Sequence, residues 1–181
     1  MTSIESSVIL AELSDADSTD LFGWINNREQ VLFSSPYRPV HQASHDAWFE
    51  AVRNSSDLVI FGIRRASNNQ LIGSAQLLNI QPRHRHAELQ IRLGDVPARS
   101  QGLGTQAVRQ LVSFGFTDLN LNRIYLHVFE SNEAARRVYE KVGFQDEGLL
   151  REAAYIDGDY VDVRVMGLLR AEWEALVAGQ S

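Results

Sequence analysis

The stretch "ARSQGLGTQAV", residues 98–108, sets two glycines directly before a helix-like run. A glycine costs about 1 kcal/mol relative to alanine inside a helix, so Gly102 and Gly104 indicate a tight turn or a close approach of the backbone to another group. Apolar residues then keep a helical period from Thr105 to Thr117, and the preceding residues, His86 to Leu93, alternate as in a strand with one buried face. The sequence therefore predicts a strand, a glycine loop and a helix in succession.

The glycine loop has the features of an anion site. Free backbone N–H groups converge at the start of a helix, and the helix dipole favours negative charge there. Arg99 would add a fixed cation. The stretch lacks the lysine of the ATPase phosphate loop and the third glycine of the dinucleotide fingerprint, which excludes both motifs. A phosphate ligand is therefore expected, with a plain strand-to-helix turn as the alternative.

The rest of the chain predicts an α/β or α+β sheet with helices on both faces. Further strands are expected over Ser7–Leu13, Leu58–Arg64, Gln70–Ile80, Arg123–Phe129, Phe144–Ile156 and Tyr160–Leu169, the last two joined by an Asp157-Gly158 hairpin turn. Further helices are expected around Leu21–Ile25 with Ser14 or Asp15 as the cap, over His41–Val52, over Asn132–Val142 with Gly143 as its end, and in the tail after Leu169. The two prolines in residues 33–40 predict a loop.

Composition limits the class of protein. The chain has 181 residues, 44% of them hydrophobic, as expected for one soluble globular domain. Its N-terminus has no basic start followed by a long apolar stretch, so we expect a cytoplasmic protein without a membrane partner. The absence of cysteine excludes disulfides, a thiolate nucleophile and cysteine-ligated zinc. A formal net charge of −6 disfavours nonspecific binding of nucleic acid and mildly favours cationic partners.

A second segment, "ESNEAARRVYEKVGF" (residues 130–144), complements the glycine loop. The pattern Arg99-x-x-Gly102-x-Gly104 resembles the acetyl-CoA pyrophosphate loop of the GNAT superfamily of N-acetyltransferases, and residues 130–144 resemble its later signature. Ser100 stands where that family commonly has a glycine. The likeness covers about Ile72 to Leu169 and is closest to the branch of spermidine and ribosomal-protein N-terminal acetyltransferases.

The resemblance implies a single-domain GNAT fold, with a central mixed, mostly antiparallel sheet flanked by helices on both faces. One N-acetyltransferase domain would span residues 1–181, with an acceptor-side part (1–56), an acetyl-CoA-binding core (57–169) and a C-terminal tail (170–181). It also suggests a homodimer.

The reaction that the resemblance implies is transfer of an acetyl group from acetyl-CoA to a primary amine through a tetrahedral intermediate, without a metal. A polyamine acceptor fits the acidic charge and the closest likeness. A protein N-terminus, an aminosugar nucleotide and an aminoglycoside stay open as acceptors, as does a non-catalytic module that binds coenzyme A.

Two residues are predicted to be catalytic. An amine attacks only when neutral, and a lysine-like amine has a pKa of about 10.4, so the site must help to remove a proton. Glu88, on the polar face of the central strand, is the expected helper, through a water or by binding the cationic substrate; a salt-bridged strand carboxylate is the alternative. Tyr139 is expected to protonate the departing thiolate, with a core aromatic on the helix as the alternative.

The resemblance also implies which residues bind the coenzyme. Backbone N–H groups at Ile91–Leu93 would take the pantetheine as an added strand, where a bulge separates the two central strands. The coenzyme-binding residues implied are Ile91, Arg92, Leu93, Arg99, Ser100, Gln101, Gly102, Leu103, Gly104, Thr105, Asn132, Ala135 and Arg137. Asn132 could equally be a plain helix cap. We also expect that substituting Gly102 weakens coenzyme binding more than it weakens the fold.

Several further residues fit either a site or an ordinary structural role. His84, His86 and Glu88 share one strand face, a metal-like spacing that is common by chance and that acetyl transfer does not require. Acceptor contacts are suggested for Trp24, Glu29, Tyr37, His45, Tyr155, Asp157 and Tyr160, for each of which a core, surface or turn role is the alternative.

Overall fold

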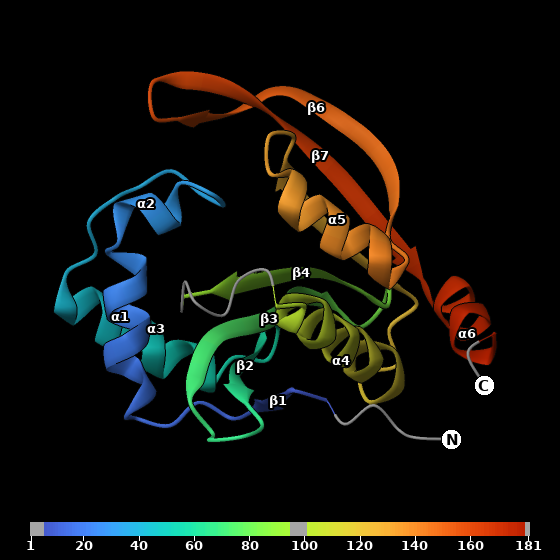
Figure 1. Cartoon of the computed structure of the whole chain (residues 1–181), viewed down its shortest axis with the longest axis horizontal. Helices are drawn as coiled ribbons and strands as arrows, with labels where there is room; N and C mark the ends of the chain where they lie inside the picture. The colour runs from blue at the N-terminus through green and yellow to red at the C-terminus, as the bar shows by residue number, and fades with distance from the viewer. Residues whose placement is uncertain (1–5, 95–100, 180–181) are drawn as a thin grey trace.

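Seven strands form one sheet in the order β1-β2-β3-β4-β5-β7-β6 (Figure 1). The computed structural model describes residues 6–94 and 101–179. The strands are β1 (Val8–Ala11), β2 (Val59–Arg65), β3 (Leu71–Gln81), β4 (His86–Leu93), β5 (Arg123–Phe129), β6 (Gln145–Ile156) and β7 (Asp159–Leu169). Neighbouring strands are antiparallel except β4 and β5, which are parallel. The mixed, mostly antiparallel sheet expected from the sequence is confirmed.

The connections explain where the helices lie. The helices are α1 (Asp17–Ile25), α2 (Arg28–Val31), α3 (Gln42–Arg53), α4 (Leu103–Thr117), α5 (Glu133–Val142) and α6 (Arg170–Ala178). Parallel strands need a crossover, and α4 provides it between β4 and β5. β5 and β6 both run antiparallel to β7, so α5 is a second crossover, and right-handed crossovers in one direction place both helices on one face. In Figure 1, α4 and α5 lie next to each other on that face.

Two hydrophobic clusters cover the two faces of the sheet. The larger lies under α4 and contains Leu77, Leu111 and Phe116, all fully buried. The smaller joins α1 and α3 to the sheet. Adjacent residues of β2 point to opposite faces, since Phe61 packs against the larger cluster and Ile60 against the smaller. Helices therefore lie on both faces, as expected.

Some boundaries differ from the expectation. Helix α1 has Ala16 at its N-cap rather than Ser14 or Asp15; Asp17, the first helical residue, accepts hydrogen bonds from the Ser14 backbone N (2.7 Å) and Oγ (2.9 Å). Helix α4 begins at Leu103, two residues earlier than its apolar period indicated. The four-residue helix α2 was not expected, because one turn is too short to show a period. No helix within residues 6–94 and 101–179 is long and apolar enough to cross a membrane.

A buried ion pair connects α1 to the sheet, and its contribution to stability can be tested. Asp17 Oδ2 lies 2.5 Å from Arg64 Nη2 of β2, and both side chains are largely buried. Removing one partner leaves an uncompensated charge, so we expect Asp17→Ala to lower the free energy of unfolding by about 3 kcal/mol. Asp20→Ala, at an exposed position of the same helix, is the control and should cost no more than about 0.5 kcal/mol. Urea denaturation of both variants measures the difference; equal losses would show that the ion pair does not stabilise the fold.

Candidate active site

β4 and β5 separate along their length and leave a wedge between them. They pair only over His86–Glu88 with Arg123–Tyr125, although the strands continue to Leu93 and Phe129. The other edge of β4 stays paired with β3 in continuous register to Leu93. The expected bulge is not at this point, since the register shift of the β3–β4 ladder lies between Leu78 and Gln81. The vertex of the wedge is therefore the last pair, Glu88 with Tyr125.

The backbone of β4 presents polar groups to this wedge. Gly94 N donates to Ile72 O at 3.0 Å. Hydrogen-bonding direction alternates along an antiparallel ladder, so the N–H and C=O groups of Ile91 and Leu93 point away from β3, into the wedge. The backbone groups of Arg92 point toward β3 instead. Of the three residues expected to bind pantetheine through their backbone groups, Ile91 and Leu93 thus point toward the wedge, and Arg92 does not.

The N-terminus of α4 lies at the open end of the wedge, after β4. The N–H groups of Leu103, Gly104 and Thr105 belong to the unpaired first turn of the helix and have no partner among residues 6–94 and 101–179. Arg99 and Ser100 lie outside the described residues. Gln101 Oε1 accepts a hydrogen bond from Arg65 Nη1 at 3.2 Å, so β2 brings a cation beside the loop that the sequence pattern did not indicate.

The structure requires a glycine at one of the two glycine positions of the loop but not at the other. Gly102 has φ +76°, a left-handed conformation that side chains other than glycine's rarely adopt. A side chain at this position would strain the turn itself, so a substitution costs stability as well; that it weakens coenzyme binding more than it weakens the fold stays a prediction. At Gly104 an added Cβ would meet only Leu93 Cδ1, at an ordinary 3.5 Å, among the described residues. The packing of the described residues therefore does not require a glycine at 104.

Helix α5 begins beside α4 and carries Tyr139 back along the wedge. Seven helical residues from Asn132 span roughly 10 Å, and the strand residues from Tyr125 to Phe129 span roughly 13 Å, so Tyr139 lies near the level of the vertex. Its side chain is buried, with its ring centroid 5.9 Å from that of Phe144. Burial raises the pKa of Tyr139 to about 12. The phenol therefore keeps its proton at neutral pH.

Asn132 has two structural partners. Its Oδ1 accepts from Ala135 N at 3.2 Å and so caps α5, while its Nδ2 donates to Phe33 O at 3.0 Å. The cap role is thus present in the structure, and the same side chain connects α5 to the segment after α2. Arg137 lies on the exposed side of α5, paired with Glu133 at 2.7 Å.

The opposite face of the sheet holds a polar cluster at the vertex. Glu88 Oε1 lies 3.0 Å from His127 Nδ1, and Glu88 Oε2 accepts from Asn79 Nδ2 at 3.2 Å. The alternative role of Glu88, a salt-bridged strand carboxylate, therefore has a definite partner in His127, which the sequence did not lead us to expect. The sequence does show that His127 and Tyr125, two residues apart in a strand, share one face of β5.

The N-terminal part approaches the wedge from this face. Arg28 of α2 forms an ion pair with Asp157 in the β6–β7 turn, and Arg92 Nη2 lies 3.5 Å from Ser34 Oγ. Trp24 packs over Gly94, where a Cβ would lie 1.8 Å from the indole. Glu29 is exposed on α2 and Tyr37 half-buried in the following loop.

His45 is not a surface residue of the site. It is buried to 2% exposure, its ring contacts those of Phe22, Trp48 and Phe49, and its Nε2 lies 3.1 Å from Ser18 Oγ. The suggestion of an acceptor contact is therefore corrected to a core role.

The histidines of the metal-like spacing lie side by side. His84 and His86 stack with ring centroids 6.0 Å apart, and no group of three potential metal ligands gathers within the described parts of the chain.

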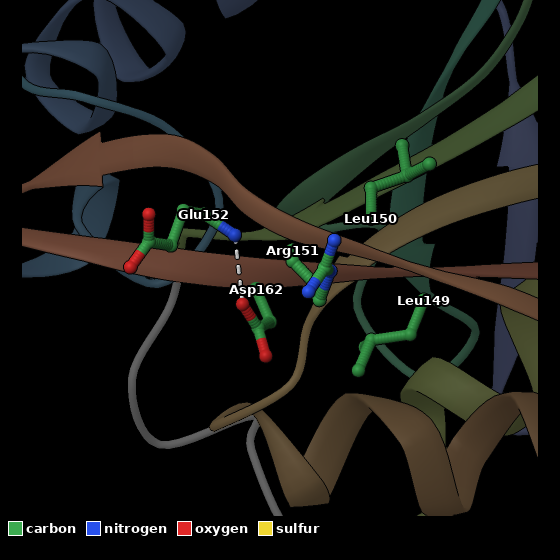
Figure 2. Close-up of a pocket in the computed structure, with 5 residues that line it drawn as sticks. All are labelled: Leu149, Leu150, Arg151, Glu152 and Asp162. Atoms are coloured by element: carbon green, nitrogen blue, oxygen red, sulfur yellow. Dashed lines mark hydrogen bonds between the residues drawn. The ribbon is translucent and has the colours of Figure 1, made fainter.

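The β6–β7 hairpin extends beyond the rest of the sheet. Its turn has Asp157 and Gly158 at positive φ, as the Asp-Gly signal predicted, and the Tyr155 and Tyr160 rings lie 5.1 Å apart, both exposed. Further along, β6 bulges between Leu150 and Ala154. An open hollow of about 750 Å³ lies there, lined by Leu149, Leu150, Arg151, Glu152 and Asp162. Glu152 N donates to Asp162 Oδ1 at 2.8 Å, and Figure 2 shows how these residues lie. None of the residues expected to be catalytic or coenzyme-binding lines it.

Comparisons with known proteins agree with this geometry. The model of the acetyltransferase (GNAT) domain family matches residues 7–145. A spermidine N(1)-acetyltransferase of Vibrio cholerae is 31% identical over 82% of this chain and 86% of its own length. The putative ribosomal N-acetyltransferase YdaF of Bacillus subtilis is 33% identical over 94% and 96%. The crystal structure of the Vibrio cholerae spermidine N-acetyltransferase with CoA and spermine has a TM-score of 0.87 at 29% identity, covering 94% of this chain and 99% of that one.

The first turn of α4, whose N–H groups have no partner in the part of the chain that the structure describes, predicts how Gly104 variants behave. A carboxylate at the second helical position interacts favourably with the helix dipole, so Gly104→Glu should leave the melting temperature unchanged or higher. The same carboxylate would repel a bound pyrophosphate. Gly104→Gln, of equal size, is the neutral control. We expect the Kd for coenzyme A, measured by calorimetry, to be at least about tenfold higher for the Glu variant than for the Gln variant, a difference of about 1.4 kcal/mol. Equal affinities would exclude an anion site at this helix start.

Proposed function

The chain belongs to the GNAT acetyltransferase family and is an N-acetyltransferase, and we propose that it moves the acetyl group of acetyl-CoA to a primary amine of a polyamine. The observation that carries this proposal is a pair of groups on opposite faces of the sheet, near the level of the vertex. A buried phenol that keeps its proton at neutral pH, Tyr139, lies on one face, and a cluster able to take up a proton, around Glu88, lies on the other. The two groups suit the two proton transfers that amide formation requires.

The donor is proposed to lie along the open edge of β4. Its pantetheine would hydrogen-bond to the backbone groups of Ile91 and Leu93, which point into the wedge. Its pyrophosphate would meet the free N–H groups of α4, with Arg65 and Gln101 beside them. The predicted roles of Arg99 and Ser100 remain part of this proposal.

The acceptor is proposed to enter from the face that carries Glu88. A polyamine fits the formal net charge of −6 and the substrates named for the spermidine acetyltransferase relatives. The neutral amine attacks the thioester carbonyl, a C–N bond forms, and the tetrahedral intermediate collapses with cleavage of the C–S bond. Tyr139 would supply the proton that the departing thiolate takes up.

One observation favours a second kind of acceptor. Arg92 shares the face of Glu88, roughly 13 Å along the strand. It has no carboxylate partner among residues 6–94 and 101–179, and burial lowers the pKa of its guanidinium. An amine that also carries an acidic group, such as an aminosugar nucleotide, would pair with that cation.

Self-association is a further proposal. Most side chains of β6, including Leu149 and Leu150, are exposed, and the strand lies at the edge of the sheet. Long exposed edges favour pairing with another chain. The Vibrio cholerae spermidine acetyltransferase, which is 30% identical, has been solved as a dodecamer. A second copy of this chain on β6 is consistent with both facts.

An acceptor panel tests the proposed function. Thiol release from acetyl-CoA is followed with spermidine, a peptide with a free N-terminus and an aminosugar nucleotide. We expect spermidine to raise the rate at least about tenfold above background, as a specific acceptor should. Arg92→Gln separates the two candidates, because it should raise KM for the acidic acceptor and leave KM for spermidine unchanged. A chain that gains thermal stability from coenzyme A and releases no thiol with any amine would be a binding module.

Tyr139→Phe tests the proton donor. Removing a general acid should lower kcat at least about tenfold while the Kd for coenzyme A stays within about twofold. A donor works while it is protonated, so the contribution of Tyr139 is present at low and neutral pH and is lost only as pH rises through its pKa of about 12. The wild-type kcat should therefore show no decline attributable to Tyr139 between about pH 7 and pH 10. Unchanged turnover in the Phe variant, with an unchanged melting temperature, would remove Tyr139 from the chemistry.

A further inference from the structure

The contact between Glu88 and His127 determines which nitrogen of the His127 ring can accept a proton. His127 Nδ1 lies 3.0 Å from Glu88 Oε1, and an unprotonated ring nitrogen facing a carboxylate oxygen would place two acceptors against each other. Nδ1 therefore carries the proton that is donated to Glu88. In the neutral ring the lone pair is then on Nε2, the nitrogen on the far side from the carboxylate.

Glu88 is less accessible than its partner. Its side chain is 13% exposed, whereas that of His127 is 39% exposed. Both carboxylate oxygens are occupied, one by His127 and the other by Asn79 Nδ2. A solute on this face of the sheet therefore meets the imidazole before it meets the carboxylate.

His127 also lies on the part of β5 that borders the wedge. The β4–β5 ladder ends at Tyr125, and His127 is the next residue of β5 on the same face. His86, the other histidine near the vertex, lies inside the paired part, with its ring against Tyr125. The titratable and charged side chains facing this cluster are Glu88 and His86 from β4, Tyr125 and Arg123 from β5, and Glu147 from β6, which pairs with Arg123.

We propose that His127 is the catalytic base, and that Glu88 is a positioning residue that fixes its tautomer and stabilises the imidazolium once it forms. This inference rests on the proposed acetyl transfer and changes the role expected for Glu88. It does not depend on which amine is the acceptor.

The acceptor arrives as an ammonium ion and gives one proton to His127 Nε2, which leaves the neutral amine. Attack forms the C–N bond, and cleavage of the C–S bond releases a thiolate that is protonated by Tyr139. The nitrogen loses its second proton as the amide forms, and that proton replaces the one lost by Tyr139, through solvent. His127 returns its proton to solvent, so one proton is released per acetyl group transferred.

The pH dependence of kcat separates a histidine base from a carboxylate base. His127→Asn keeps an N–H donor where Nδ1 lies but removes Nε2; His127→Gln is the second variant, should the first fold poorly. Glu88→Gln keeps an oxygen acceptor and removes the charge. The kcat of each is measured from pH 5 to pH 10 with the amine that the wild-type enzyme acetylates fastest, and coenzyme A affinity and melting temperature are measured alongside.

We expect both His127 variants to lose at least about 100-fold in kcat, with unchanged coenzyme affinity. They should also lose the acidic limb of the pH profile, which is the fall in kcat toward low pH as the base becomes protonated. Glu88→Gln should lose about tenfold and keep the limb, because the imidazole that takes up the proton is still present and only its positioning is impaired. The inference is overturned if the His127 variants keep the limb, or if Glu88→Gln abolishes it. A wild-type chain that acetylates no amine refutes the proposed function instead, so the two failures are distinguishable.

Discussion

The arrangement of the site depends on one short parallel pairing. β4 and β5 are hydrogen-bonded over three residue pairs, and a parallel pair requires a crossover helix between its strands. That crossover places the start of α4 at the open end of the wedge. The next crossover places the start of α5 beside it. Backbone donors and two helix N-termini border the wedge, and the vertex residues close its other end, because the ladder stops at Glu88 and Tyr125 while the strands continue.

The two proposed proton-transfer groups lie on opposite faces of the sheet, and their surroundings differ. Tyr139 is held in the hydrophobic core under α5, where burial disfavours the phenolate. His127 lies on the polar face, partly open to solvent, with a carboxylate at one ring nitrogen. The sheet thus separates a group that retains its proton from a group that can exchange one, and the wedge is where a reactant could contact both.

Most of the fold was predictable, because alternation and helical periods are local signals. The strand at residues 86–93, the Asp157-Gly158 turn and the capping of α5 by Asn132 all follow from neighbours in sequence. The residues that were missed depend on pairing between distant segments. Nothing near His127 in the sequence shows that β5 will lie beside Glu88, and nothing near Arg65 shows that β2 will bring it to Gln101. The core role of His45 combines both kinds of signal, because Trp48 and Phe49 are its neighbours on α3 itself, whereas Phe22 reaches it only when α1 packs against α3.

The amide of Asn132 attaches the segment after α2 to α5 in a way that does not depend on that segment's side chains. It donates to the carbonyl of Phe33, a backbone group that every residue type supplies equally. Side chains along the segment can therefore diverge without loosening its attachment to α5, provided that the chain path brings a carbonyl to the same place. Substitutions in this loop can therefore alter the surface that it presents, while its hydrogen bond to the helix that carries Tyr139 is kept.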